Sequence, residues 1–307
     1  MAISKGNHSL DPQEYKRYTG VATMFVKAIN PNKKEHEELF NTTLEEAPNY
    51  IKEDTDNDGK PYKSARISVI MQNDAEKTGF EMPLVTMALF IQNRYRFNRD
   101  KTKVQIIDKY GRTTWASVED AKANKIPLDK NGKPLNIDKD YRPAYVGEEE
   151  LMNFVKAYLW IPDITMWDNN TRSFVPNTKV KPEECECRFD DLSKIFTGDF
   201  SEIIDALGYQ PTNKVKVLLG VRTDIETGKM YQTVLTKKFL RSNATNYKAF
   251  TDEVQNMIDY ATANGRTLNT EYQVCEVHEY KVVPTTFTPV ETESEDDMPF
   301  SSGSPWD

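Results

Sequence analysis

The chain has 307 residues, of which 38% are hydrophobic and 29% are charged, a composition typical of one large or two small globular domains. The longest stretch without a charged residue, Met82 to Asn93, is too short to cross a membrane. The N-terminal residues lack the apolar region of a secretory signal, and 3 cysteines are too few for a disulfide framework. We therefore expect a cytoplasmic protein.

Charge is distributed unevenly along the chain. The net charge is −8, but Thr285–Asp307 holds six acidic residues and no basic one, so the preceding 284 residues carry only −2. Within that part, Ile91–Arg112 has a net charge of +5 and Pro211–Phe250 a net charge of +6. The overall negative charge therefore does not exclude binding to a nucleic acid.

Residues 285–307 are predicted to form a disordered acidic tail. They are rich in Pro, Ser, Thr and acidic residues, and they offer too little apolar surface to offset the entropy lost on ordering. We place the boundary near Pro284, so that residues 1–284 form the folded body. No other shift in composition is sharp enough to mark a linker inside the body.

Strand-forming residues dominate the body. Segments rich in Val, Ile, Tyr, Phe and Thr, often in alternation with polar residues, are predicted to be strands. In chain order they are Tyr18–Ile29, Tyr62–Gln72, Leu84–Gln92, Lys103–Ile107, Arg172–Pro176, Val215–Thr223, Met230–Leu240 and Tyr272–Val283.

Three segments are predicted to be helical. Gly147–Leu159 has apolar residues at the spacing of a half-buried helix, with three glutamates in its first turn where the helix dipole favours acids. Asp199 and Glu202 predict a capping box for a short helix that ends at Gly208, and Tyr247–Ala263 is the third segment. Because strands follow one another without helices between them, we expect a β-rich α+β fold with peripheral helices.

Two similar heptapeptides, Asp56–Tyr62 and Asp129–Leu135, predict hairpin turns in which Gly59 and Gly132 take positive φ angles. The first also resembles the start of a calcium-binding loop. However, Ala65 stands where such a loop requires a bidentate glutamate. A solvated turn is the better interpretation.

The cysteines form a weak candidate for a metal site. Three thiolates and one imidazole would make a closed tetrahedral zinc site, from Cys185, Cys187, Cys275 and His278. The two pairs lie far apart in the sequence, and Cys-x-Cys is not a common zinc-finger spacing. Buried thiols are the favoured interpretation, and we expect no cofactor.

Sequence motifs of catalysis are missing. The chain contains no phosphate-binding glycine loop, no dinucleotide fingerprint and no nucleophile elbow. Neither His8 nor His36 has a nucleophile beside it in the sequence. We therefore expect a protein that is not an enzyme.

Aromatic residues interleave with cations in both basic segments. Within Arg94–Arg99, arginines alternate with aromatic rings, so a strand would place the first two arginines on one side and the rings on the other. Pro211–Phe250 is predicted to form a two-stranded basic arm around a turn at Asp224–Gly228 and has the larger positive charge, so we rank it first. Proteins that bind single-stranded nucleic acids need cations for the backbone and rings for the bases.

An alternative interpretation treats these segments as solvated strand faces over core aromatics. On the first interpretation, the candidate DNA-binding residues are Arg94, Tyr95, Arg96, Phe97, Arg99, Lys214, Lys216, Arg222, Lys229, Tyr231, Lys237, Lys238 and Arg241.

The tail supplies a second indication. Its acidic run, Glu-Asp-Asp-Met-Pro-Phe at Glu295–Phe300, resembles the Asp-Asp-Asp-Ile-Pro-Phe tip of bacterial and phage single-stranded DNA-binding proteins. In that family the tail recruits replication and repair partners and competes with DNA for the basic groove. The resemblance implies that the partner-binding residues are Asp296, Asp297, Met298, Pro299 and Phe300.

One departure from the family concerns the end of the chain. The family's phenylalanine is usually the last residue, whereas here Ser301–Asp307 follow Phe300. Trp306 is therefore a second candidate for the aromatic tip. The body is also larger than the bacterial domain and closer in size to the elaborated versions of large tailed phages.

The resemblance implies an elaborated OB-like antiparallel barrel with helical insertions. Its expected function is sequence-independent binding and protection of single-stranded DNA during phage replication, recombination and repair in the host cytoplasm. The tail would recruit a polymerase, helicase or primase, and no membrane would be involved. Two alternatives stay open: a phage structural or scaffolding protein whose basic strands contact other subunits, and an RNA-binding version of the same fold.

Overall fold

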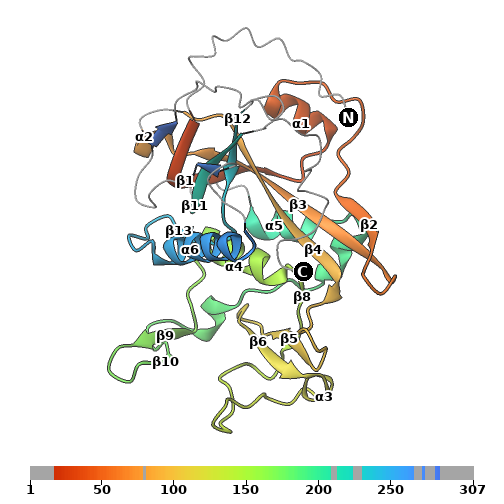
Figure 1. The fold of residues 1–307 in the computed structure, drawn as a ribbon, viewed down its shortest axis with the longest axis vertical. Helices are drawn as coiled ribbons and strands as arrows, with labels where there is room; N and C mark the ends of the chain where they lie inside the picture. Colours follow the sequence, from red (N-terminus) through yellow and green to blue (C-terminus); the bar gives the residue numbers. More distant parts are fainter. Residues whose placement is uncertain are drawn as a thin grey trace.

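A sheet of antiparallel strands forms the upper part of the structure (Figure 1). This computed structural model describes residues 17–78, 81–208, 213–223, 230–265, 272–273 and 281–283. The strand order is β12-β11-β1-β3-β4-β8, with β13 and β14 paired to β11, β15 to β1 and β2 to β3. The bounds are β1 Arg17–Ile29, β2 Ile51–Thr55, β3 Pro61–Asn73, β4 Val85–Tyr95, β8 Tyr145–Val146, β11 Val215–Thr223, β12 Met230–Val234, β13 Leu240–Arg241, β14 Tyr272–Gln273 and β15 Lys281–Val283.

Helices lie mainly around the sheet. Their bounds are α1 Lys33–Phe40, α2 Ala75–Thr78, α3 Val118–Lys122, α4 Glu148–Tyr158, α5 Ser201–Leu207 and α6 Lys248–Ala263, with 3-10 turns η2 Pro182–Cys185 and η3 Leu192–Thr197. No helix among the described residues is long and apolar enough to cross a membrane.

Two smaller sheets form the lower part of the molecule (Figure 1). One has the order β6-β5-β7, with β5 Lys103–Ile107, β6 Thr113–Ser117 and β7 Arg142–Pro143. It has its own small core, made by Val104, Ile106, Ala116, Ile137 and Tyr141. The other is the hairpin of β9 Thr165–Asp168 and β10 Ser173–Pro176.

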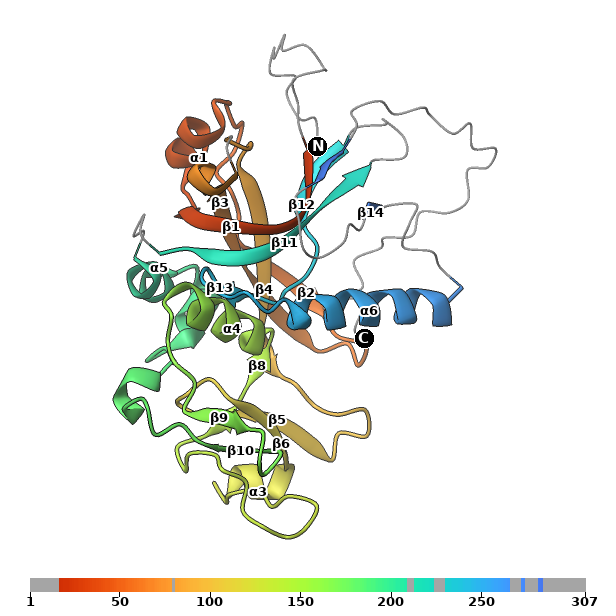
Figure 2. The same cartoon turned by 90° about the vertical axis from the view of Figure 1, so that its left-hand side faces the viewer.

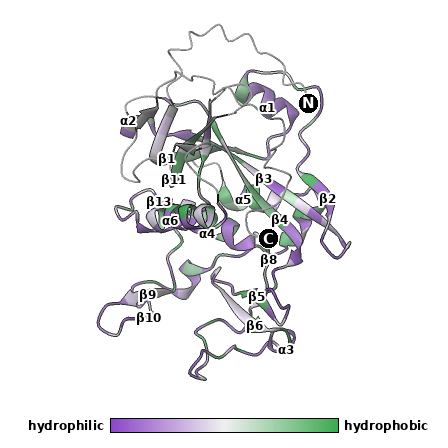
Figure 3. Cartoon of the chain, viewed as in Figure 1, coloured by the Kyte–Doolittle hydropathy of each residue, from purple (hydrophilic) through white to green (hydrophobic). Residues whose placement is uncertain are grey.

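The main core lies on one face of the large sheet, which we call the inner face. On β4 the buried residues alternate with more exposed ones, and the buried set is Val85, Met87, Leu89 and Ile91. Helix α4 packs against this face, and the ring of its Phe154 lies edge-on to Phe239 at a centroid distance of 5.2 Å. Figure 3 shows the hydrophobic residues gathered on the long strands, whereas α1 is largely hydrophilic. The period-2 pattern of the sequence therefore decides which face α4 covers.

Helix α6 covers part of the opposite face, which we call the outer face. Its Phe250 is fully buried and packs against Val21 of β1 and Leu218 of β11. Figure 2 shows α6 beneath β11 and β12. The outer face at β3 and β4 lies beyond this contact.

The antiparallel, β-rich α+β fold expected from the sequence is confirmed, and β1, β3, β4 and β11 begin and end close to the predicted bounds. Most of the predicted strand Tyr272–Val283 lies outside the described residues. One strand prediction is wrong. The segment Met230–Leu240 is not a single strand, because β12 ends at Val234 and the next strand, β13, begins only at Leu240. Within the described residues, the pairing of strands does not close into a barrel.

Local turn and cap predictions have mixed outcomes. Gly59 and Gly132 take φ angles of +75° and +76°, so both hairpin turns are confirmed. The capping box of α5 is wrong, since the N-cap residue is Phe200. The Asp199 carboxylate accepts from the backbone of Ser201 at 3.0 Å, whereas Glu202 accepts from the backbone of a distant loop at residues 190–191.

We expect Gly147→Ala to lower the free energy of unfolding by about 3–5 kcal/mol. Gly147 has a φ of +86°, and an added Cβ would lie 1.8 Å from the backbone oxygen of Phe90. Gly198→Ala is the matched control, because Gly198 has a φ of +90° but nothing within 4 Å of an added Cβ. The control should cost about 1–2 kcal/mol, from backbone strain alone. Urea denaturation measures both values, and equal losses would contradict the close approach.

Candidate nucleic-acid interface

Phe90 is an exposed aromatic residue at a position where a sheet usually presents a polar side chain. It lies on the outer face of β4, and 46% of its surface is exposed. Its partner in the antiparallel register is Arg66 of β3, which is also exposed. A ring and a guanidinium therefore stand side by side on the outer face.

A second ring and cation lie further along the same two strands. The Arg94 guanidinium lies 4.4 Å from the centroid of the Tyr62 ring, which is a cation–π contact. The Nε of Arg94 donates to the side-chain oxygen of Gln92 at 2.6 Å. This arrangement holds the guanidinium over the sheet without an ion pair among the described residues.

The outer face continues from β4 into the small sheet. The backbone oxygen of Arg96 accepts from the N–H of Gln105 at 2.8 Å, and Gln105 stands opposite Trp115 in the register of β5 and β6. Trp115 is 38% exposed, and Lys103 on the same face of β5 is exposed. We name this surface the outer strip and define it by Tyr62, Arg66, Phe90, Arg94, Arg96, Lys103 and Trp115.

The outer strip has more cations than acidic neighbours. Among the described residues, its one ion pair joins Arg96 to Glu149 of α4 at 3.6 Å. Lys52 of β2, beside the strip, pairs with Asp54 at 3.2 Å. Within that same part of the chain Arg66, Arg94 and Lys103 form no ion pair, although Asp54, opposite Tyr62 in the register of β2 and β3, interacts electrostatically with Arg94. Arg66 and Lys103 are exposed, and Arg94 is half-buried.

The residues predicted around Arg94 follow the expected alternation only to the end of β4. Tyr95 lies on the other side from Arg94, where its ring stacks on Tyr145 at a centroid distance of 5.4 Å. Phe97 forms a single bridge with Val104 and is 44% exposed. Arg99 is exposed in the connection between β4 and β5.

The second basic segment is only partly the arm that the sequence predicts. β11 and β12 do pair as a hairpin, with Arg222 opposite Tyr231. However, the two lysines at the start of this segment make contacts within the molecule. Lys214 pairs with Asp74 at 2.7 Å, and the Lys216 ammonium donates to the hydroxyl of Tyr247 at 3.0 Å.

The cations after β12 are also held by the body of the protein. Lys237 pairs with Glu150 of α4 at 2.8 Å, and Arg241 donates to the backbone oxygen of Ile161 at 2.7 Å. Only Lys238 and Tyr231 of this segment are exposed without such a contact in the described part of the chain. Lys229 and the side chain of Arg222 lie outside the described residues.

Sequence reasoning missed most of the outer strip. Tyr62, Arg66, Phe90, Lys103 and Trp115 were not among the predicted contacts. A signal for Phe90 exists in the sequence: Val85, Met87, Leu89 and Ile91 alternate strictly, so Phe90 must share the opposite face with Thr86 and Ala88.

The two described cysteines of the zinc candidate lie in the core. Cys185 and Cys187 are 0% and 4% exposed, and the Cys187 sulfur lies 3.7 Å from the sulfur of Met152. Burial raises the pKa of the Cys187 thiol to about 11. Cys275 and His278 lie outside the described residues, as do the five predicted partner-binding residues from Asp296 to Phe300.

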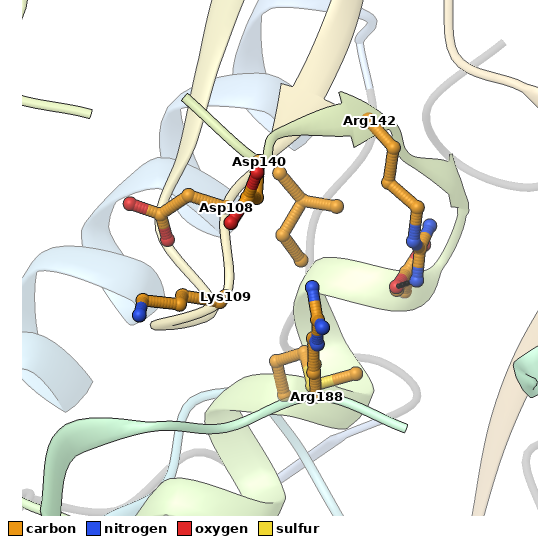
Figure 4. Close-up of a pocket in the computed structure, with 8 residues that line it drawn as sticks. Asp108, Lys109, Asp140, Arg142 and Arg188 are labelled. Carbon is orange, nitrogen blue, oxygen red and sulfur yellow. Dashed lines mark hydrogen bonds and ion pairs between the residues drawn. The ribbon is translucent and has the colours of Figure 1, made fainter. Parts of the chain in front are cut away.

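A small cavity opens between β5 and α4 (Figure 4). Its lining is mostly charged, and these charges are largely satisfied: Asp108 pairs with Arg112 at 2.6 Å, and Arg142 pairs with Glu148. Sites for small molecules are usually apolar with a few polar groups. The cavity therefore does not have the character of a substrate pocket.

Comparison of the chain with protein-family profiles, with curated proteins and with solved structures finds no match. The assignment of a function therefore rests on the residues and their geometry.

We expect Cys187 to resist alkylation in the folded protein. With its pKa raised to about 11, almost none of this thiol is ionised at pH 8, and only the thiolate reacts. Peptide mass spectrometry after iodoacetamide treatment at pH 8 should show little label at Cys187 in the native state and full label in urea. Rapid labelling of Cys187 in the folded protein would contradict the burial of its thiol.

Proposed function

We propose that this chain binds single-stranded DNA, without sequence preference, through the outer strip. The observation that carries the proposal is the pairing of exposed Phe90 with exposed Arg66 on a sheet face that otherwise follows a regular inside–outside alternation. Proteins that bind single strands combine cations along the backbone with rings for the bases. The strip offers both side by side, which favours it over the β11–β12 segment.

Binding would combine two contributions. Arg66, Arg94 and Lys103 form no ion pair among the described residues, so they can neutralise phosphates and release counterions. The rings of Phe90 and Trp115 can each stack on a base, which contributes about 1–3 kcal/mol per base. Neither contribution distinguishes one base from another, so the expected binding is independent of sequence.

We also propose that the large sheet is an elaborated OB-like barrel. Its support is the approach of β12 to β4, which brings the two ends of the five-strand series β12-β11-β1-β3-β4 toward one another. Barrels of this kind bind single strands on the outside of the sheet. The outer strip lies on that side.

The biological setting follows from the resemblance of the acidic tail. We propose a phage protein of the host cytoplasm that protects single strands during replication and recombination and is not an enzyme. The tail, from Asp296 to Phe300, would recruit a polymerase, helicase or primase. Acidic residues would contact a basic rim on the partner while Phe300 fills an apolar pocket.

A second candidate function is contact with other protein subunits, as in a structural or scaffolding protein. The observation that favours it is the β9–β10 hairpin. Trp167 and Phe174 lie edge-to-face there at 5.3 Å, and they are 50% and 70% exposed. Exposed aromatic pairs are common at the centres of protein interfaces.

The outer strip is tested with a paired substitution, Arg66→Ala with Phe90→Ala. We expect affinity for oligo-dT to fall about tenfold or more, since one phosphate contact and one stacked base are lost. The slope of log K against log salt should become shallower by about 0.7 for the lost phosphate contact. Fluorescence anisotropy at several salt concentrations measures both quantities, and oligo-U in parallel separates DNA from RNA preference.

The control is Lys237→Ala with Arg241→Ala, which changes cations that the body already holds. These substitutions should leave affinity and salt slope nearly unchanged. If the control pair lost affinity and the strip pair did not, the interface would lie on the β11–β12 side and the proposal would be wrong.

The tail is tested with Phe300→Ala. A buried Phe contributes roughly 1.5–3 kcal/mol, so recruitment of a replication partner should fall about tenfold to a hundredfold while DNA binding is retained. Trp306→Ala is the matched aromatic control and should matter less, because Phe300 directly follows the acidic run. A pull-down in which Trp306→Ala loses the partner and Phe300→Ala keeps it would show that the resemblance is misplaced.

A further inference from the structure

Three groups that can donate hydrogen bonds, from β5, from β6 and from the residue after β4, converge on one carboxylate beside the outer strip. The carboxylate of Glu149 accepts from the Gln105 amide at 3.0 Å and from the Thr113 hydroxyl at 2.9 Å. The guanidinium of Arg96 lies 3.6 Å from the same group. An amide, a hydroxyl and a guanidinium directed at one point form a donor set suited to an oxyanion.

The neighbouring glutamates of α4 have different partners. Glu148 is fully buried and binds Arg142, and Glu150 pairs with Lys237 at 2.8 Å. Glu149 alone of the three reaches the outer strip. Its carboxylate therefore stands among the cations of the strip, with Arg96 as its ion-pair partner.

We propose that Arg96, Gln105 and Thr113 form a binding site for one phosphate group of a nucleic acid, and that Glu149 occupies this site in the free protein. This inference rests on the proposed function, and it assigns Glu149 the role of regulating nucleic-acid binding. A phosphate oxygen can replace a carboxylate oxygen at each of the three donors. The carboxylate must move aside for this exchange, so the resident charge weakens binding of every competing anion.

Two features make the exchange feasible. The side chains of Arg96 and Glu149 are 49% and 38% exposed, and exposed ion pairs contribute little to stability. Gln105 is 6% exposed and stands opposite Trp115 in the register of β5 and β6. The side-chain amide of Gln105 is therefore held beside the Trp115 ring, on which a base could stack. A nucleotide whose base stacks on Trp115 would bring its phosphate near these donors.

The experiment compares Glu149→Gln with Glu150→Gln. Both substitutions remove one negative charge from the first turn of α4, but only the first removes it from the proposed site. We expect Glu149→Gln to bind oligo-dT about fivefold more tightly at low salt, with a salt slope steeper by about 0.7 as Arg96 gains a phosphate. Glu150→Gln should show a smaller gain and an unchanged slope. Adding Arg96→Ala to Glu149→Gln should abolish the gain.

A second probe separates this inference from the proposed function. Tripolyphosphate, titrated by calorimetry, should bind Glu149→Gln more tightly than it binds Glu150→Gln or the unaltered protein. If no form of the protein bound oligo-dT, the proposed function would fail, and the tripolyphosphate result alone would decide on the phosphate site. Equal behaviour of Glu149→Gln and Glu150→Gln toward both probes would overturn the site, even if oligo-dT bound well.

Discussion

The start of helix α4 joins the two parts of the molecule, and the geometry of the outer strip depends on it. The buried carboxylate of Glu148 accepts from the guanidinium of Arg142 and, at 2.9 Å, from the backbone N–H of Tyr145, so β7, β8 and α4 meet at one group. Loss of one partner of a buried pair usually destabilises a protein by about 3–5 kcal/mol. With that turn fixed, Glu149 is directed toward the small sheet and Glu150 toward the segment after β12. The same glutamates also suit the positive end of the helix dipole.

The sequence predicts the long strands well, because burial on one face of a sheet imposes period 2 on its residues. It predicts interruptions poorly when a distant contact causes them. The segment Met230–Leu240 has strand-forming residues throughout, yet β12 ends at Val234, and Leu235 packs against Leu218 of β11 and Phe250 of α6. An added Cβ at Gly220 would lie 2.5 Å from the Leu235 side chain, so the glycine provides the room for that side chain. Glu202 shows the same limit, since a distant loop takes the carboxylate that a local pattern would assign to a helix cap.

The candidate site was less predictable than the fold, for an electrostatic reason. A count of charges along a segment registers only neighbours in sequence, whereas the partner of Lys214 is Asp74, 140 residues away. Lys237 is likewise paired with Glu150. Segment charge therefore overstated the free cations of the β11–β12 side. The cations of β3 and β4 lie on one face of the sheet. Which residues are neighbours on that face depends on the strand register, which places Arg66 beside Phe90.

The two candidate surfaces differ in the chemistry that they offer a partner. Single exposed aromatics are ordinary on protein surfaces, so Phe90 alone would carry little weight. Its neighbours Arg66, Arg94 and Lys103 form no ion pair in the described part of the chain, and a protein partner would need a matched acidic patch to satisfy them. A polyanion supplies that charge along its whole length. The β9–β10 hairpin is different, because Thr165–Pro176 carries one acidic and one basic residue around the Trp167–Phe174 pair. The hairpin therefore offers phosphates little electrostatic attraction, and it suits contact with a protein. The outer strip suits a nucleic acid. One molecule can use both surfaces.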